Sequence, residues 1–175
     1  MGGRARAIGG RVSPALPVDP DLADGAHRAI RDRRRAAAQR AILLVVGAAG
    51  ILGALSRYAV SRLLPTPAGR FPWSTFWINI TGSLVIGFVL VLLTERFPRA
   101  RVARPLVATG FLGAYTTFST YMVDADLLFR GHDLAMGAEY AVGSLLAGGG
   151  AALVGIWLGR FLMVLDRHLD EHLGS

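Results

Sequence analysis

The chain has 175 residues, of which 53% are hydrophobic and 18% are charged, and its mean hydropathy is +0.44. This balance excludes an ordinary soluble domain of the same length and favours a small membrane protein. The absence of cysteine excludes disulfides and thiolate metal sites. The net charge is +7 and all 19 basic residues are arginine. Because these arginines flank apolar segments, they predict contact with a membrane surface and not with nucleic acid.

The first 39 residues form a polar leader that contains three prolines and a cluster of four arginines around Asp32. The leader has too few apolar residues to fold alone. We therefore expect a disordered basic arm over residues 1–39, with at most a short helix near residues 22–38. A targeting peptide is the alternative, but the next apolar segment is long enough to span a bilayer and no convincing cleavage site precedes it.

Four apolar segments follow, at about residues 41–64, 73–94, 102–129 and 134–164. Each exceeds the roughly 20 residues needed to cross a bilayer, and the loops between them are short and carry proline or glycine. The pattern predicts an all-α membrane domain over residues 40–164 with four transmembrane helices. In the charged tail at residues 165–175, His168 and His172 share a helix face. A solvated tail is favoured there over a metal site because no third ligand is fixed beside them.

The arginines are distributed unevenly between the two sides of the predicted membrane domain. With four spans, both termini lie on one side, together with the loop between the second and third segments. That side holds nine arginines before the first span, four in the loop and two near the C-terminus, whereas the opposite side has Arg70 and Arg130, with Arg62 close to it. The positive-inside rule then predicts a multi-pass protein of the cell membrane with both termini in the cytoplasm.

The third apolar segment contains a polar stretch, GFLGAYTTFSTY, from Gly110 to Tyr121. Lipid cannot satisfy bare backbone groups, so non-helical backbone at membrane depth must be buried in protein or line a wet cavity. The glycines and hydroxyl residues therefore predict a helix broken at mid-membrane that forms an ion or substrate site. The alternative is a continuous helix with small residues for packing and hydroxyls bonded to the preceding turn.

Polar residues in the other segments each allow two interpretations. Arg57 follows a stripe of small residues and either reaches the membrane surface or serves an anion pathway. Asn79 either joins two helices or offers its amide N–H to an anion. Tyr140 and Ser144, four residues apart, line either a close-packed interface or a polar path. We find no phosphate-binding glycine loop, no nucleophile–base pair and no mid-membrane carboxylate, so the sequence does not predict an enzyme.

Three motifs, GAAGILGALSRY, WINITGSLVIG and GFLGAYTTFST, resemble the CrcB/Fluc family of fluoride channels in their order and spacing. The resemblance covers roughly residues 42–162. It implies four transmembrane helices, the third broken at mid-membrane, and an antiparallel dual-topology-type dimer that encloses two narrow pores. It also implies a fluoride-specific ion channel that gives passive fluoride efflux and so lowers fluoride toxicity in the cytoplasm.

The resemblance implies a role for individual residues as well. Asn79 would donate to fluoride, Phe118 and Tyr121 would present ring edges to it, and the carbonyls of Gly113 and Thr116 would bind a structural sodium ion that is not transported. The remaining pore positions would be Arg57 at the aqueous entrance and a polar track of Ser119, Thr120, Tyr140 and Ser144. Tyr121 stands where the family usually has phenylalanine, and Asp124 stands where glutamate is expected. Leaving water costs fluoride on the order of tens of kcal/mol, which an amide, hydroxyls and ring edges can offset.

The arginine asymmetry bears on the partner of this chain. An antiparallel homodimer needs a subunit that inserts both ways, whereas this chain is strongly asymmetric, which predicts an oppositely oriented homologous partner. Two rival functions stay open. A proton-coupled small multidrug exporter would need a buried carboxylate in the first segment, which has none. In a non-conducting membrane scaffold, the polar stretch of the third segment would serve packing alone.

Overall fold

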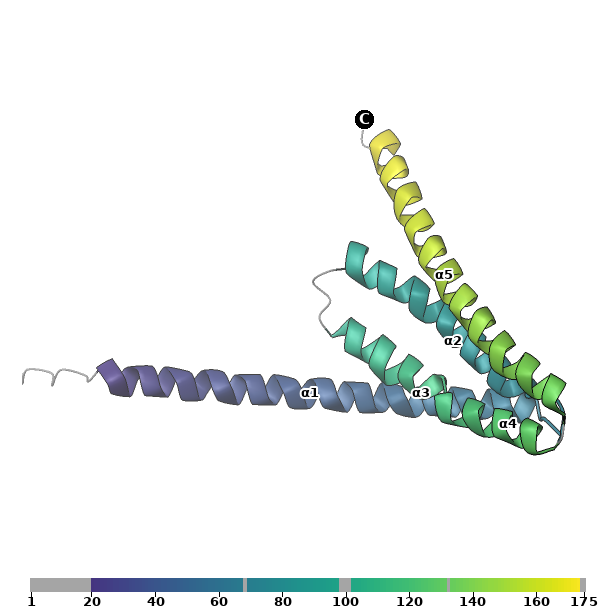
Figure 1. Ribbon diagram of the computed structural model, residues 1–175. Helices are drawn as coiled ribbons and strands as arrows, with labels where there is room; N and C mark the ends of the chain where they lie inside the picture. The colour runs from purple at the N-terminus through teal and green to yellow at the C-terminus, as the bar shows by residue number, and fades with distance from the viewer. Residues whose placement is uncertain (1–19, 68, 98–101, 132, 174–175) are drawn as a thin grey trace, which may run out of the picture. The chain divides into compact units, whose positions relative to one another are not determined.

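The computed structural model describes residues 20–67, 69–97, 102–131 and 133–173, and within these ranges the ordered elements are all helical. Figure 1 shows their course along the chain. The elements are α1 (Pro20–Leu63), α2 (Trp73–Val91), the π-helix η1 (Leu92–Arg96), the π-helix η2 (Pro105–Leu112), α3 (Gly113–Tyr115), α4 (Phe118–Arg130) and α5 (Leu134–Leu173). The predicted all-α class is confirmed for the described part of the chain.

The chain divides into two compact units, residues 1–38 and residues 39–175. In the first unit, residues 20–38 form the beginning of α1, and residues 1–19 lie outside the described residues. The helix is longer than the short one expected near residues 22–38, because alanine and arginine, which dominate this stretch, are strong helix formers. At the other end, α5 runs through most of the charged tail to Leu173; the side chains of His168 and His172 lie outside the described residues. The proposed division at residues 39 and 164 stays a prediction.

Among the residues that the structure describes, three helical stretches are long and apolar enough to cross a membrane: Arg28–Leu63, Trp73–Arg96 and Leu134–Asp166. The third apolar segment is divided instead. Its first part, η2 with α3, ends at Tyr115, and α4 begins at Phe118. Thr116 (φ −75°, ψ 158°) and Thr117 (φ −147°, ψ 122°) between them are extended. The polar stretch from Gly110 to Tyr121 therefore contains the predicted break, and the continuous-helix alternative is wrong.

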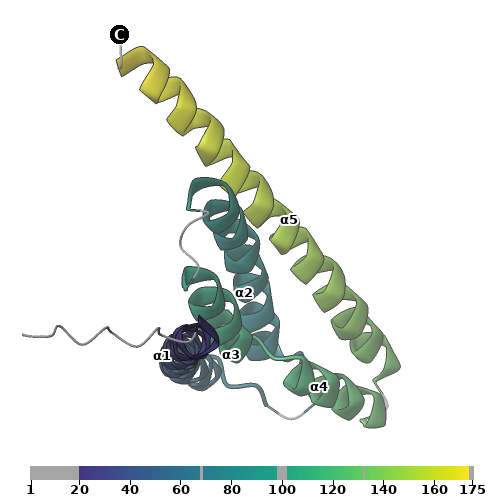
Figure 2. The ribbon, with the colours of Figure 1, turned by 90° about the vertical axis from the view of Figure 1, so that its left-hand side faces the viewer.

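The second unit is built around α2 and α5, which lie side by side in both views of the ribbon (Figures 1 and 2). Their backbones touch at glycines: a Cβ atom on Gly87 would overlap the carbonyl of Ala152, and one on Gly155 would overlap the carbonyl of Leu84. Contact of this kind is typical of helices that pack in lipid, where small residues allow close approach. The pair forms the frame against which the divided segment is placed.

Local sequence signals mark the end of α1 and the starts of α2 and α5. Pro65 and Pro67 follow α1, and Gly69 adopts φ +73°, a left-handed conformation that glycine tolerates best. Pro72 immediately precedes α2. At the start of α5, Asp133 accepts a hydrogen bond through Oδ1 from the N–H of Met136 at 2.9 Å, as an N-cap residue does.

Candidate functional site

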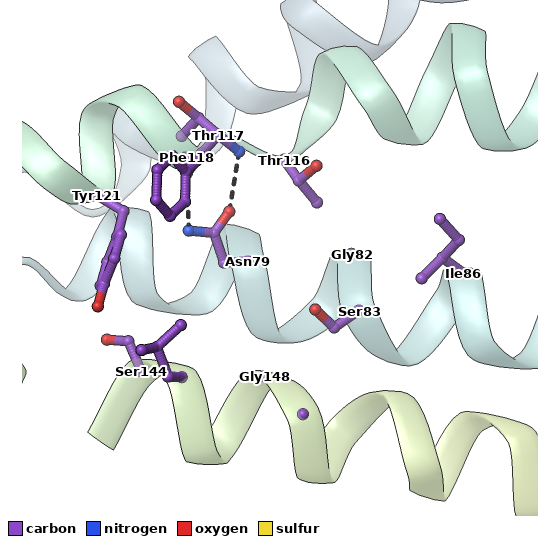
Figure 3. A pocket seen from close by; sticks show the side chains of 12 residues that line it. Asn79, Gly82, Ser83, Ile86, Thr116, Thr117, Phe118, Tyr121, Ser144 and Gly148 are labelled. Carbon is purple, nitrogen blue, oxygen red and sulfur yellow. Dashed lines mark hydrogen bonds between the residues drawn. The ribbon is translucent and has the colours of Figure 1, made fainter. Parts of the chain in front are cut away.

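The break between α3 and α4 is held by the side chain of Asn79 on α2 (Figure 3). The amide Nδ2 of Asn79 donates to the carbonyl of Thr117 at 3.0 Å, and the N–H of Thr117 donates to Asn79 Oδ1 at 2.9 Å. Thr117 is only 7% exposed, so its backbone groups need these partners. The pair of bonds also fixes the amide: the backbone N–H must face Oδ1, so the NH₂ group cannot exchange places with it.

The two threonines of the break bond to their own helices. Thr117 caps α4, because its Oγ1 accepts from the N–H of Thr120 at 3.1 Å and donates to the hydroxyl of Thr120 at 3.0 Å. Thr116 ends α3 with two bonds to one acceptor: its N–H and its Oγ1 donate to the carbonyl of Leu112 at 3.0 and 2.9 Å. Ser119 lies beside the cap, with its Oγ 3.3 Å from that of Thr117.

A cavity of about 370 Å³ lies next to the break, between α2, α4 and α5. Asn79, Phe118, Tyr121 and Ser144 all line it (Figure 3). The ring of Phe118 is 70% exposed, whereas Tyr121 and Ser144 are buried. Within the described part of the chain, the Oγ atom of Ser144 is buried without a hydrogen-bond partner. A buried hydroxyl without a partner is unusual in a native structure, and it offers a donor to an occupant of the cavity.

Behind this cavity, α4 and α5 meet through hydroxyl groups and aromatic rings. Asp124 on α4 accepts two hydrogen bonds through Oδ2, from Thr75 Oγ1 at 2.6 Å and from the hydroxyl of Tyr140 at 3.4 Å. The hydroxyl of Tyr121 donates to the carbonyl of Ala141 at 2.7 Å. Tyr140 is fully buried and its ring centroid lies 5.4 Å from that of Tyr121. This contact is the hydrophobic core of the described residues around the site.

A second cavity, of about 440 Å³, lies on the other side of Thr117. Its lining includes Arg57 from α1, Thr120 and Asp124 from α4, and Thr75 from α2. Thr117 lines both cavities, so the break separates them. The second cavity therefore combines a half-buried guanidinium with a carboxylate and hydroxyls.

The structure brings some of the predicted site residues together and leaves others apart. Asn79, Phe118, Tyr121 and Ser144 share the first cavity, whereas Arg57 and Thr120 line the second. Ser119 is exposed and Tyr140 is buried between helices, and neither lines these two cavities.

Sequence reasoning missed Thr75 and Thr117. Thr75 lies four residues before Asn79, one helical turn away on the same face of α2, which was the available signal. Thr117 lies between Thr116 and Phe118, which were both given roles. No feature of the sequence around Thr117 indicated that it is the partner of Asn79.

The carbonyl of Gly113 could bind a metal ion. In a continuous helix it would accept the N–H of Thr117, but that N–H is donated to Asn79. Within the part of the chain that the structure describes, no group of three or more histidine, cysteine, aspartate or glutamate side chains could hold a metal. The backbone carbonyls near the break, at Gly113 and Thr116, are oxygen ligands of the kind that a hard cation prefers.

Long apolar helices with a divided helix and polar groups gathered at its break define a class: membrane proteins that move small solutes or ions. The sequence comparison gives the family. Residues 44–156 match the family model described as CrcB-like protein, Camphor Resistance (CrcB), and the chain belongs to this family.

Curated relatives support the same assignment. The chain is 42% identical over 130 residues to a fluoride-specific ion channel of Streptomyces avermitilis, a match that covers 74% of this chain and 63% of the relative. It is 46% identical over 120 residues to a fluoride-specific ion channel of Streptomyces coelicolor, covering 69% of this chain and 75% of the relative. A fluoride-specific ion channel of Nitrobacter winogradskyi is 38% identical over 121 residues, covering 69% of this chain and 96% of the relative.

Proposed function

We propose that the chain is a subunit of a fluoride-specific ion channel that lets fluoride leave the cytoplasm passively and so reduces its toxicity. The observation that carries the proposal is the amide of Asn79, which is held by the backbone of Thr117 at the edge of a cavity. The names of the relatives, all fluoride-specific ion channels, supply the identity of the ion.

The orientation of this amide favours an anion. Oδ1 of Asn79 is engaged by the N–H of Thr117, and one proton of Nδ2 is engaged by the carbonyl of Thr117. The second proton of Nδ2 is left as a donor. The hydroxyl of Ser144 is a second free donor on the same cavity, and the ring of Phe118 can offer its positive edge. Together these groups can replace part of the hydration shell that fluoride loses.

The membrane topology that goes with this function has four spans. In it, η2 with α3 and α4 cross the bilayer together as the third span, with the break at mid-membrane. Phe118, 70% exposed beside the cavity, would be covered by a second subunit in an antiparallel dimer. Two such cavities, one on each subunit, would then be closed into two pores.

We further propose an oppositely oriented homologous subunit as the partner, with both termini of this chain in the cytoplasm. The arginine asymmetry supports a single orientation. Two of the matched relatives come from Streptomyces avermitilis, so one organism can carry more than one such chain. Because the chain has no cysteine, a Thr66→Cys variant gives a single label site in the α1–α2 loop. Labelling of intact cells from outside only is expected; equal labelling from both sides would exclude the heterodimer.

A structural sodium ion, bound by the carbonyls of Gly113 and Thr116 from two subunits, is also part of the proposal. The diversion of the Thr117 N–H to Asn79 supports it, because it frees the Gly113 carbonyl from helical pairing. The purified protein should unfold at a lower temperature when sodium is replaced by choline. An unchanged unfolding temperature would argue against the ion.

Fluoride efflux from lipid vesicles tests the main proposal. Vesicles that hold the chain together with its partner subunit should release fluoride to an electrode, and Asn79→Asp should reduce the rate at least about a hundredfold, because a second carboxylate oxygen replaces the free donor. Phe118→Ile, which removes the ring edge, should also reduce it. Thr94→Val is the matched control, since among the described residues the hydroxyl of Thr94 donates only to the carbonyls of Leu90 and Val91, in the helical turn before it. A wild-type trace equal to that of empty vesicles would favour the scaffold, and drug uptake driven by a pH gradient would favour the exporter.

A further inference from the structure

The contact between α4 and α5 contains two tyrosines whose hydroxyl groups bond in opposite directions. Tyr121 on α4 donates to the backbone carbonyl of Ala141 on α5 at 2.7 Å. Tyr140 on α5 donates to the carboxylate of Asp124 on α4 at 3.4 Å. Their rings lie between these two bonds, with centroids 5.4 Å apart and planes inclined at 45°. Each helix thus holds the other at two points.

The donor inventory of a tyrosine decides what Tyr121 can do for an anion. A phenolic hydroxyl carries one proton, and the hydroxyl can bind an anion only by donating that proton. The proton of Tyr121 is directed to Ala141. In Figure 3 the hydroxyl of Tyr121 points toward α5. The residue lines the cavity of Asn79 through its ring and not through its hydroxyl. Tyr121 therefore has a ring edge, but no free O–H, to offer an ion.

The position of Phe118 depends on the same contact. Phe118 lies one turn before Tyr121 on α4, and their ring centroids are 5.7 Å apart. Phe118 is 70% exposed, and the ring of Tyr121 beside it is buried. A change in the angle between α4 and α5 would move both rings, and with them the width of the cavity beside Asn79.

We propose that Tyr121 and Tyr140 form a reciprocal clasp that fixes α4 on α5 and holds the ring of Phe118 in place. Tyr121 is then a positioning residue that sets which anions fit, and its hydroxyl is not an ion ligand. This inference rests on the proposed channel function. The clasp needs a hydroxyl at position 121, which a phenylalanine at that position would lack.

The test uses Tyr121→Phe, which keeps the ring and removes the hydroxyl. Fluoride and chloride efflux are measured from vesicles that hold the full chain. The ratio of fluoride to chloride efflux should fall about tenfold, as expected for the loss of one or two hydrogen bonds. Tyr140→Phe should give the same fall, and the double variant should be no worse than either single one, because both release one contact. Tyr115→Phe, which loses a hydroxyl contact with Thr81 Oγ1 at 2.9 Å, is the matched control.

Each other outcome has a definite meaning. A large fall in fluoride efflux with chloride still excluded would make the hydroxyl an ion ligand and overturn the clasp. Unchanged rates for both ions, with only a lower unfolding temperature, would reduce the contact to packing and also overturn it. A readout that needs no conduction is the ¹⁹F spectrum of 4-fluorophenylalanine at position 118. A narrow line in the wild type that shifts or broadens in Tyr121→Phe, but not in Tyr115→Phe, supports the clasp. This result stands even if wild-type vesicles release no fluoride. The lack of efflux would overturn only the proposal that the chain forms a channel.

Discussion

The crossing of α2 and α5 and the break at Thr116–Thr117 pair their backbone hydrogen-bonding groups in opposite ways. At the crossing, the backbone bonds are made inside continuous helices, and the contact depends on the absence of side chains at Gly87 and Gly155. At the break, the helical bonds are lost, and a side chain from another helix, Asn79, takes their place. The first contact needs nothing beyond the small size of its residues, whereas the second needs one particular functional group.

The difference explains where a site can form. Backbone groups that are paired within a helix have nothing left to offer an ion in lipid. A break leaves carbonyls and donors that must be paired, and the group that pairs them brings further donors of its own. Asn79 satisfies both backbone groups of Thr117 and, by its donor inventory, keeps one N–H, which is the donor that the proposed fluoride site would use.

Removal of the amide should have the largest effect on stability. Asn79→Leu has a similar volume but leaves the N–H and the carbonyl of the buried Thr117 without partners. We expect a loss of about 2–4 kcal/mol in the free energy of unfolding, since each orphaned group costs roughly 1–3 kcal/mol. Thermal unfolding of the purified protein in detergent measures it, with Thr94→Val as the control. Equal unfolding temperatures for the two variants would show that Thr117 has other partners.

The sequence identified the apolar segments and the break, because both follow from composition along the chain. The second segment, predicted at residues 73–94, is helical from Trp73 to Arg96. The break falls inside the polar stretch that has glycines and hydroxyls in place of aliphatic residues. The π-helical turns at η1 and η2 were not predicted, because no residue pattern in the sequence indicated them.

Contacts between segments were beyond the reach of the pattern. Thr75 and Asp124 are 49 residues apart, and Asn79 and Thr117 are 38 apart, so neither pair shows in local spacing. Asn79 was noticed because an amide is rare in an apolar segment, but both its interpretations were open. The structure shows that Asn79 joins two segments, which is the first interpretation. It also leaves one N–H of the amide for the second interpretation, the binding of an anion. The hydroxyl of Tyr121 donates to the carbonyl of Ala141, 20 residues away on another segment, and residue spacing did not predict this contact.

A side chain added at the crossing should have the next largest effect. Gly155→Ala places a methyl group against the carbonyl of Leu84, and backbone cannot move aside as a side chain can. The free energy of unfolding should fall by about 1–3 kcal/mol, as for other overpacked contacts. Gly143→Ala, on the same helix with no atom within 4 Å of the new Cβ, should be neutral or slightly stabilising. If both variants unfold alike, the close approach of α2 and α5 is not what holds the frame together.

The smallest effect should come from the cap of α4, and it separates the two functions of Thr117. Thr117→Val keeps the backbone bonds to Asn79 but removes the acceptor for the N–H of Thr120. A lost threonine cap costs about 1 kcal/mol, so the variant should be clearly more stable than Asn79→Leu. Thr116→Val is the control, because the carbonyl of Leu112 still receives the N–H of residue 116. Hydrogen exchange at Thr120 should rise in Thr117→Val alone. If Thr117→Val proved as damaging as Asn79→Leu, the hydroxyl and not the backbone of Thr117 would be the group that holds the break.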